Sequence, residues 1–482
     1  MKHLMYINGK WVKGQNYFSS INPATERIIA EFPSAASDDI KKAVNSAEAA
    51  YDAWKATPAP KRGLILQRVA QLLRERKEEL AVIETQEMGK ALAEARGDVQ
   101  EAIDVFDYMA GEGRRLFGHT TTSELQDKFA MTIRIPTGIC SLITPWNFPI
   151  AIPAWKISAA LICGNTVVFK PSSDTPLSAM KLVEIIEKAG IPPGVVNFVT
   201  GSGKELGKEL VSNKKIRCIS FTGSKETGEW ITQNAGLKKV GLELGGKNGI
   251  IIMDDANLRL AAEGVTWGAF GTTGQRCTAA SRVIVHAKVK NKFEKMLCAK
   301  ANALRLGDGL KKTTDIGPLV NKSALEKTVE YVSIGKNEGA KLICGGKRTG
   351  LKGYFFEPTI FTNVQPDMRI AQEEIFGPIL SVIEVKSLDE AIDVMNKIEY
   401  GLSSSIYTQD INKAMAAVEQ IEAGITYVNS STIGAEVHLP FGGVKQTGHG
   451  REGGILGIDE FSEMKTVYID YSDRLQKAQI DK

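Results

Sequence analysis

Residues 380–428 read LSVIEVKSLDEAIDVMNKIEYGLSSSIYTQDINKAMAAVEQIEAGITYV, and short β-rich runs alternate with helix-length amphipathic segments along this stretch. The pattern predicts, in order, strand 380–385, helix 388–398, strand 403–407, helix 411–421 and strand 425–428. Strands and helices that alternate at this spacing are typical of βαβ units, which build parallel sheets. This part of the chain therefore predicts an α/β fold.

The same alternation occurs earlier in the chain. One region has β-rich runs at 140–143, 166–169, 195–199 and 218–221, with a helical segment at 176–189. Another has an apolar run at 250–252 and helical patterns at 258–268 and 289–303. We therefore expect two parallel-sheet α/β domains with a break near residue 248.

The two ends of the chain differ from this pattern. A short strand and turn at 6–12 precede a mostly helical region, with helical patterns at 40–54, 62–87 and 90–117. Residues 465–471 alternate like a strand after the second sheet should be complete. This strand either pairs with another subunit or forms the edge of a sheet in its own chain.

Composition places the chain among ordinary globular proteins. Its 482 residues are 43% hydrophobic, and 60 basic against 56 acidic side chains give a formal net charge of +4. This charge is too small to indicate a nucleic-acid partner. The longest apolar candidate, 150–169, contains Lys156 and Asn165, so neither membrane spanning nor export is expected. We expect a cytoplasmic protein that acts on a small molecule.

The six cysteines are Cys140, Cys163, Cys218, Cys277, Cys298 and Cys344. Their spacing fits neither a disulfide framework nor a zinc site, and we expect no metal. Five of them lie in helical or strand-like patterns, where a thiol usually packs as a small hydrophobe. Cys277 differs, because it lies in the glycine-rich, turn-forming stretch 271–278 (GTTGQRCT), which is able to expose a thiolate to a ligand. The alternative is an ordinary buried thiol.

Two further residues are candidates for chemistry. Glu243 lies beside the Gly245-Gly246 pair at the end of a strand-like run, where glycines allow another segment or a ligand to approach. Asn147 lies in the two-proline segment 144–149, which is able to hold its amide in place as an oxyanion donor. The alternative for Glu243 is a solvated carboxylate in a turn, and the alternative for Asn147 is a structural asparagine that forms hydrogen bonds within its own loop.

One loop is a candidate phosphate site. Residues 221–228 (FTGSKETG) follow a strand and open a helical run, so backbone N–H groups there are able to receive a phosphate. The loop lacks the G-x-G-x-x-G spacing of dinucleotide-binding folds, and Gly201, Gly203 and Gly207 miss that spacing by one residue.

Together these stretches closely resemble the aldehyde dehydrogenase superfamily of nicotinamide enzymes, and the resemblance covers nearly the whole chain. Seven motifs carry it, in register: PWNFP at 145–149, NTVVFKP at 165–171, FTGS at 221–224, LELGGK at 242–247, GQRC at 274–277, EEIFGP at 373–378 and PFGGVK at 440–445. A chance match of seven motifs is very unlikely.

The resemblance implies a mechanism. Cys277 attacks an aldehyde as a thiolate, and the Asn147 amide with the Cys277 backbone N–H holds the oxyanion. Hydride passes to the nicotinamide, and Glu243 activates the water that hydrolyses the remaining thioester. Lys156 supports this network, unless it only caps an apolar helix. Members that transfer the acyl group to coenzyme A differ at the Glu243 position, so hydrolysis to the free acid is favoured.

The resemblance also implies a cofactor site. Lys170 corresponds to the lysine that bonds the adenosine ribose, and Ser224 to a pyrophosphate contact. Ser173 replaces a glutamate that many NAD-preferring members carry, so we expect the cofactor to be NADP, the preferred one, or NAD. Lys225 is a second candidate for contact with a 2′-phosphate. The expected cofactor residues are Ile143, Thr144, Pro145, Trp146, Lys170, Ser172, Ser173, Gly203, Gly207, Phe221, Thr222, Gly223, Ser224, Glu243, Leu244, Gly245, Glu374 and Phe376.

The fold implied is that of aldehyde dehydrogenases, with two parallel-sheet α/β domains and a small β bridging element. The expected parts are a cofactor domain (1–117, 138–247 and 446–464), a catalytic domain (248–445), an oligomerisation hairpin (118–137) and a C-terminal oligomerisation strand (465–482). The resemblance implies homo-oligomers, either dimers or tetramers.

The expected substrate is a small aldehyde. Asn147, Arg276, Cys277 and Thr278 are the expected contacts, and the mouth should involve Tyr108, Trp155 and the loop 431–438. If Arg276 or Arg282 binds a carboxylate, a short semialdehyde such as succinate semialdehyde or 2,5-dioxopentanoate is favoured. A hydroxyaldehyde such as glyceraldehyde or lactaldehyde competes with it. The remaining alternatives are a coenzyme A-acylating semialdehyde dehydrogenase and a non-catalytic structural or binding protein.

Overall fold

The computed structural model describes residues 1–480. One seven-stranded sheet has the order β11-β10-β7-β8-β9-β1-β2. The first five strands in this order, from β11 to β9, are parallel, and β1 and β2 add to the β9 side in antiparallel pairing. The strands are β1 (Met5–Ile7), β2 (Lys10–Val12), β7 (Ile139–Ile143), β8 (Thr166–Lys170), β9 (Val196–Phe198), β10 (Ile216–Thr222) and β11 (Lys239–Glu243). The central strands are almost continuously apolar because helices cover both faces of the sheet.

One face of this first sheet packs against a thick helical layer, and the other packs against a thinner one. The thick layer contains α2 (Ala59–Glu75), α3 (Lys77–Met88), α4 (Leu92–Glu112), α5 (Ala151–Cys163) and α6 (Pro176–Lys188). The thin layer contains α1 (Ser37–Ala56), α7 (Gly203–Ser212) and α8 (Lys225–Asn234). The single helical stretch predicted at 62–87 is wrong, because Arg76 leaves the helical conformation (φ −111°, ψ 13°) and separates α2 from α3.

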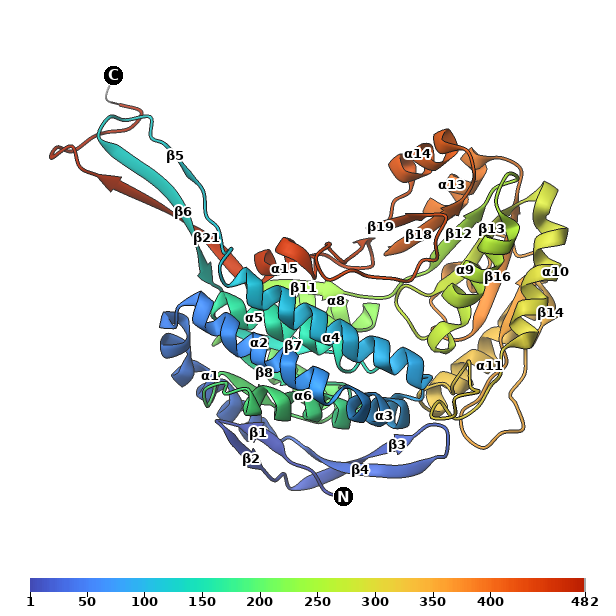
Figure 1. The fold of residues 1–482 in the computed structure, drawn as a ribbon, viewed down its shortest axis with the longest axis horizontal. Coiled ribbons are helices and arrows are strands. Elements are labelled where there is room, and N and C mark those ends of the chain that lie inside the picture. The colour runs from blue at the N-terminus through green and yellow to red at the C-terminus, as the bar shows by residue number, and fades with distance from the viewer. Residues whose placement is uncertain (481–482) are drawn as a thin grey trace.

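A second seven-stranded sheet has the order β14-β15-β16-β13-β12-β18-β19 and is parallel except at β14. Its strands are β12 (Asn248–Ile252), β13 (Ala280–His286), β14 (Lys341–Cys344), β15 (Thr359–Thr362), β16 (Ile379–Val385), β18 (Ser403–Tyr407) and β19 (Ile425–Val428). Its helices are α9 (Leu258–Phe270), α10 (Ala287–Ala303), α11 (Lys322–Asn337), α12 (Arg369–Gln372), α13 (Leu388–Asn396) and α14 (Ile411–Gln420). The predicted fold class is confirmed, and Figure 1 shows the two α/β units side by side.

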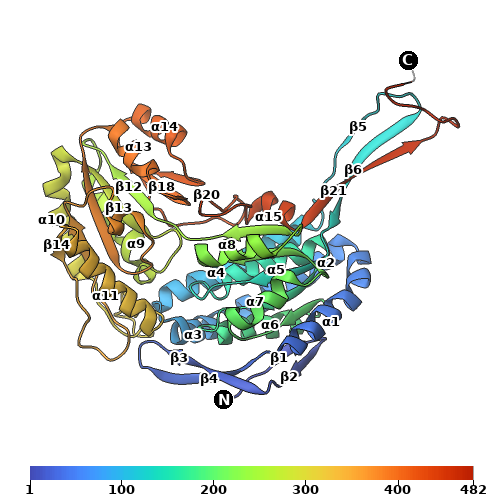
Figure 2. The ribbon, with the colours of Figure 1, turned by 180° about the vertical axis from the view of Figure 1, so that it is seen from behind.

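A three-stranded antiparallel arm projects beyond the first unit in Figures 1 and 2. It consists of β5 (Thr120–Thr122), β6 (Lys128–Pro136) and β21 (Ser462–Asp470), in the order β21-β6-β5. The terminal strand β21 therefore has its partner in its own chain, with a continuous register from Ser462↔Pro136 to Asp470↔Lys128. The helix α15 (Gly454–Glu460) precedes β21 and packs on α5, which returns the chain to the first unit.

Sequence patterns did not predict two small pairings. The strands β3 (Asn16–Asn22) and β4 (Arg27–Ser34) form a separate hairpin, and β17 (Tyr400–Gly401) pairs with β20 (Val444–Lys445). In residues 1–480, no helix has the length and apolar character needed to cross a membrane.

Candidate active site

Cys277 lies where two cavities meet. A cavity of about 160 Å³, here called the inner cavity, is lined by Cys277, Glu243, Thr278 and aromatic side chains that include Trp155. A second cavity of about 310 Å³, here called the sheet-edge cavity, is lined by Cys277, Asn147 and the ends of strands in the first sheet. The thiol-bearing residue thus contacts both spaces, and the amide and the carboxylate predicted from sequence lie next to it.

The turn that presents Cys277 is strained. The 3-10 turn η1 (Gly271–Gly274) contains two non-glycine residues in the left-handed region, Thr272 (φ 50°) and Thr273 (φ 61°). Gln275 holds the turn, because its Nε2 donates to the Thr272 carbonyl (3.2 Å) and its Oε1 accepts from the Val320 N–H (2.9 Å). Backbone strain of this kind persists only where surrounding contacts impose it, and it is concentrated at functional sites.

Asn147 precedes α5 and is tied to the same turn. Its Nδ2 donates to the carbonyl oxygen of Gln275 at 3.1 Å. Among residues 1–480, the side-chain oxygen of Asn147 has no hydrogen-bond partner, although the residue is only 3% exposed. A buried amide with unused hydrogen-bonding capacity beside a thiol is suited to bind a polar group there.

Glu243 ends β11 and is buried. Burial raises its pKa well above the usual value, and the neighbouring Glu452 raises it further, whereas Lys156 opposes the shift. Lys156 donates to the Ser220 hydroxyl (2.8 Å) and forms an ion pair with Glu452. Lys156 therefore acts on Glu243 electrostatically, through a shared group of charges. Glu452 lies in a glycine-rich loop, and the local sequence did not predict its ion pair with Lys156.

The Cys277 thiol is neutral in this environment. Burial raises its pKa to about 12, and the carboxylates of Glu243 and Glu374 add to the shift. A thiolate is the reactive form, so a base must accept the thiol proton when a substrate binds.

Half of the expected cofactor residues line the sheet-edge cavity. These are Pro145, Trp146, Thr222, Gly223, Ser224, Leu244, Gly245, Glu374 and Phe376. Gly245 has to be small, because a Cβ there would lie 2.6 Å from a carboxylate oxygen of Glu374. Ser224 caps the N-terminus of α8, and Trp146 meets Phe376 edge to face at 5.4 Å. A helix N-terminus beside flat aromatic walls fits a dinucleotide, with a phosphate at the helix end.

The other expected cofactor residues lie along the carboxyl ends of the first sheet's strands and on the neighbouring α7. They are Ile143, Thr144, Lys170, Ser172, Ser173, Gly203, Gly207, Phe221 and Glu243. Lys170 donates to the Pro171 carbonyl at 2.8 Å, and burial lowers its pKa to about 8. Ser173 donates to the Gly201 carbonyl at 3.0 Å. Lys225 is not a free cation, because it forms an ion pair with Glu399 at 2.6 Å.

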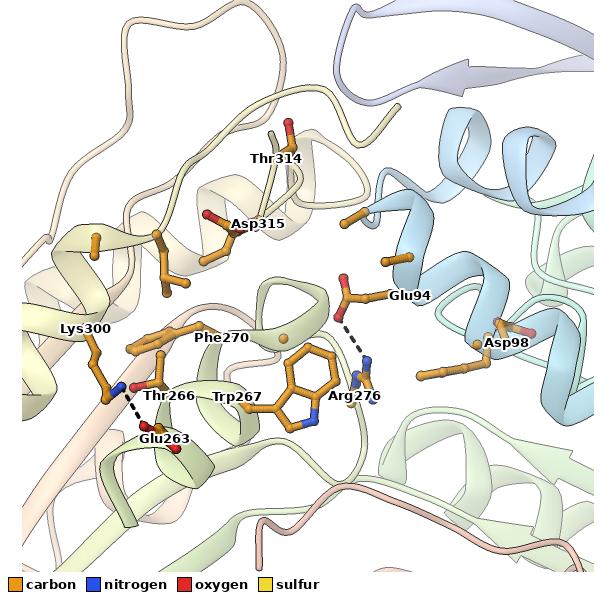
Figure 3. Close-up of a pocket in the computed structure, with 18 of the residues that line it drawn as sticks. Glu94, Asp98, Glu263, Thr266, Trp267, Phe270, Arg276, Lys300, Thr314 and Asp315 are labelled. Carbon is orange, nitrogen blue, oxygen red and sulfur yellow. Dashed lines mark hydrogen bonds and ion pairs between the residues drawn. The ribbon is translucent and has the colours of Figure 1, made fainter. Parts of the chain in front are cut away.

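A third cavity, of about 740 Å³, lies between α4 and α9 and is here called the outer cavity (Figure 3). Arg276 and Glu94 face one another there and form an ion pair at 3.0 Å. The guanidinium also lies over the rings of Phe148 (5.3 Å) and Trp267 (5.0 Å). Arg276 does line the inner cavity, but its charge is already paired, which argues against the expected role as a carboxylate ligand.

The position of Arg282 also argues against its binding a substrate carboxylate. It is 1% exposed, and its guanidinium donates to the backbone carbonyls of Lys247, Val394 and Met395. Thr278, Trp155 and residues 433–435 of the predicted mouth line the inner cavity, whereas Tyr108 lines none of the three cavities described. Sequence reasoning missed five lining residues, Glu101, Phe148, Ile152, Phe441 and Glu452.

The known proteins most relevant to this site are aldehyde dehydrogenases. The aldehyde dehydrogenase family profile matches residues 11–467. The chain is 44% identical over 477 residues to an alpha-ketoglutarate semialdehyde dehydrogenase of Haloferax volcanii, and 40% identical over 477 residues to an alpha-ketoglutaric semialdehyde dehydrogenase of Bacillus subtilis. Each alignment covers 97% of this chain and 98% of the relative.

The structure is also similar to a crystal structure of betaine aldehyde dehydrogenase from Staphylococcus aureus in complex with NAD+. The TM-score is 0.96 at 35% sequence identity, and the match covers 98% of this chain and 95% of that one. The protein therefore belongs to the aldehyde dehydrogenase family. It is an oxidoreductase that acts on aldehydes.

Proposed function

We propose that the chain oxidises a small aldehyde to the free carboxylic acid with a nicotinamide dinucleotide, and that Cys277, Asn147, Glu243 and Lys156 carry out the reaction. The observation that supports this most is the position of Cys277 between two cavities. One cavity is lined by the expected cofactor residues, and the other is lined by Glu243 and is small enough to select a small substrate.

In the proposed reaction, the Cys277 thiol gives up its proton to Glu243, and the sulfur bonds to the carbonyl carbon. The oxygen that becomes negative accepts hydrogen bonds from the Asn147 Nδ2 and the Cys277 backbone N–H. A bound nicotinamide supplies the acceptor for the hydride that leaves this carbon. The acyl group then remains on sulfur as a thioester.

Hydrolysis completes the reaction. Glu243 first passes the thiol proton to solvent. It then takes a proton from water as the water oxygen bonds to the thioester carbon, and it returns this proton to the sulfur as the carbon–sulfur bond breaks, which releases the acid and the thiol. Lys156 and Glu452 set the pKa of Glu243 for this step. Transfer to coenzyme A is the alternative to hydrolysis, and the semialdehyde dehydrogenases among the relatives do not support it.

We infer that NADP is accepted, and preferred to NAD. Ser173 carries no charge. It lies just beyond the carboxyl end of β8, which ends at Lys170, and it donates a hydrogen bond to the Gly201 carbonyl. A neutral side chain at this place does not repel a 2′-phosphate, whereas a carboxylate would.

The substrate is a short aldehyde with a polar far end. The names of the two relatives favour a semialdehyde, and the size of the inner cavity, about 160 Å³, agrees with a small substrate such as a semialdehyde or a hydroxyaldehyde. We further infer a cytoplasmic homo-oligomer. The arm supports assembly, since it exposes Phe129, Tyr468 and Ile469 on strands that project from the molecule. The six cysteines are free thiols, which suits a reducing compartment.

One experiment tests the reaction as a whole. Purified wild type should form reduced cofactor from short aldehydes and release the free acid, with or without coenzyme A. Cys277→Ala should lower kcat by more than about 10³-fold while dinucleotide binding persists, because the nucleophile is lost and the cofactor contacts remain. Cys298→Ala is the matched control and should retain activity. Substantial turnover by Cys277→Ala, or a thioester product with coenzyme A, would contradict the proposal.

A further inference from the structure

Two cysteines of the second α/β unit lie beside each other, and neither lines the three cavities described above. Cys298 lies on α10, and Cys344 is the last residue of β14, which packs against that helix. The Cys298 Sγ lies 3.9 Å from the carbonyl oxygen of Ile343, the residue before Cys344. The Cys344 Sγ lies 3.1 Å from the Oδ1 of Asn302, one helical turn beyond Cys298. The two thiols therefore face each other across the contact between helix and strand.

The two sulfur atoms also interact directly. The Cys344 thiol donates a hydrogen bond to the Cys298 sulfur, and this bond is the largest influence on both groups. It lowers the pKa of Cys298 below the usual thiol value, although partial burial and the carboxylate of Glu294 oppose the shift. The same bond, together with burial, raises the pKa of Cys344. The pair is thus arranged so that a proton on Cys344 stabilises a thiolate on Cys298.

The two thiols differ in their access to solvent. Cys298 is partly exposed, whereas Cys344 is buried, with 7% of its surface exposed. Redox-sensing cysteines have this arrangement, in which an accessible thiol of low pKa lies next to a second thiol that resolves its oxidised form.

The chain contains a second thiol pair that provides a comparison. Cys140 and Cys218 lie directly opposite each other on β7 and β10, and both are 0% exposed. Burial raises the pKa of Cys140 well above the usual value. Burial also raises the pKa of the Cys277 thiol to about 12. Because the thiolate is the reactive form, Cys298 should react with a soluble oxidant before these other thiols.

We propose that Cys298 and Cys344 form a reversible disulfide when the protein meets a peroxide, while Cys277 stays reduced. The Cys298 sulfur bonds to one peroxide oxygen as the oxygen–oxygen bond breaks, and the hydroxide that leaves takes a proton from solvent. The Cys344 sulfur then bonds to the Cys298 sulfur, the sulfur–oxygen bond breaks, and the second hydroxide takes the Cys344 proton. The two thiols lose two electrons, and the peroxide is reduced to two molecules of water.

The disulfide would secure the edge of the second sheet. Strand β14 is the outermost strand and pairs only with β15, in antiparallel orientation. A bond between Cys298 and Cys344 closes a loop that contains α11 and ties this strand to α10. Because a cross-link restricts the unfolded chain, we expect the oxidised protein to unfold at a higher temperature than the reduced one.

Treatment of wild type with one equivalent of hydrogen peroxide tests the inference. The thiols that react under denaturing conditions should fall by two from the six of the reduced chain. Peptide mapping should recover a disulfide between Cys298 and Cys344 and an unmodified Cys277, and dithiothreitol should restore the lost thiols. A chain without the cross-link, a bond between Cys140 and Cys218 instead, or oxidation of Cys277 before the pair overturns the inference.

Single substitutions separate the two roles. Cys344→Ala should stop the reaction at a sulfenic acid on Cys298, which dimedone labels, whereas Cys298→Ala should leave Cys344 unoxidised. Cys218→Ala is the matched control, since it removes one thiol of the buried pair and should retain the cross-link. If a variant does not fold, the wild-type peptide map still decides the question. The readout is a covalent bond, so failure to oxidise any aldehyde would overturn the proposed function without affecting this test.

Discussion

The side-chain amide of Asn147 donates a 3.1 Å hydrogen bond to the carbonyl oxygen of Gln275, two residues before Cys277. This bond fixes the amide on the turn that carries the nucleophile and leaves its second N–H for another acceptor. Asn147→Ala should therefore lower kcat by about 10²- to 10³-fold, the loss typical of one oxyanion donor, with little change in dinucleotide affinity. Steady-state kinetics and a binding titration measure the two effects. An unchanged kcat would remove Asn147 from the proposed oxyanion site.

Glu243→Gln should slow the second half of the reaction more than the first. Glutamine keeps the shape of the side chain but accepts no proton, so the thiol must lose its proton to solvent. Once acylation has occurred, no base activates water, and the acyl group should remain on Cys277. Intact-protein mass spectrometry after mixing with substrate and cofactor should detect this adduct. Glu229→Gln, on the surface of α8, is the control and should show none. Rapid release of acid by Glu243→Gln would assign the base to another group.

Deacylation should slow as the pH falls through the pKa of Glu243, because the carboxylate must be ionised to take a proton. Burial and Glu452 hold this pKa well above the usual glutamate value, so the rate is lost at a higher pH than for an exposed glutamate. Glu452→Gln removes a negative neighbour and frees Lys156, and both changes lower the pKa. The acidic limb of the rate–pH profile should then move to lower pH. The surface variant Glu463→Gln is the control and should leave the acidic limb at the wild-type pH. If the acidic limb of Glu452→Gln moves to higher pH, the electrostatic account is wrong.

Ser173→Glu should reverse the cofactor preference. A carboxylate beside the 2′-position repels a phosphate there, so the ratio of kcat/KM for NADP to that for NAD should fall by about 10-fold or more. Ser173→Ala, which removes the hydroxyl without adding charge, should leave the ratio within about 3-fold. An equal ratio in wild type and Ser173→Glu would place the 2′-position elsewhere.

Most of the parallel strands were predicted, because they are short apolar runs between turn-forming residues, but β13 and β15 were not. An apolar helix around Lys156 was considered, but the bounds of α5 were not predicted, since nearly all of its 13 residues are buried and no amphipathic period marks its ends. The hairpin of β3 and β4 was not predicted for a related reason. One of seven side chains in β3 and three of eight in β4 are buried, which leaves little alternation in the sequence.

Within the site, nearby glycines or prolines made Cys277, Glu243 and Asn147 candidates from local sequence, and the resemblance to the family gave each its expected role. Glu101 and Glu452 were not candidates, since they reach the site through contacts with segments far away along the chain. One signal for Glu101 was available. Asp98 and Glu101 lie close to the buried residues Ala95, Val99 and Ala102 of α4, and acidic side chains are rarely placed there without a reason.

The arm joins two strands that lie on either side of the second α/β unit in the sequence. Strand β6 finds its long partner β21 only after that unit has been synthesised, and until then one edge of β6 is unpaired while Phe129 and Ile133 lie on its surface. Nascent chains therefore carry an open strand edge throughout the synthesis of the second α/β unit, which is a hazard for aggregation. A chain truncated before residue 462 would keep that edge of β6 unpaired, so β21 protects a strand edge as well as completing the fold.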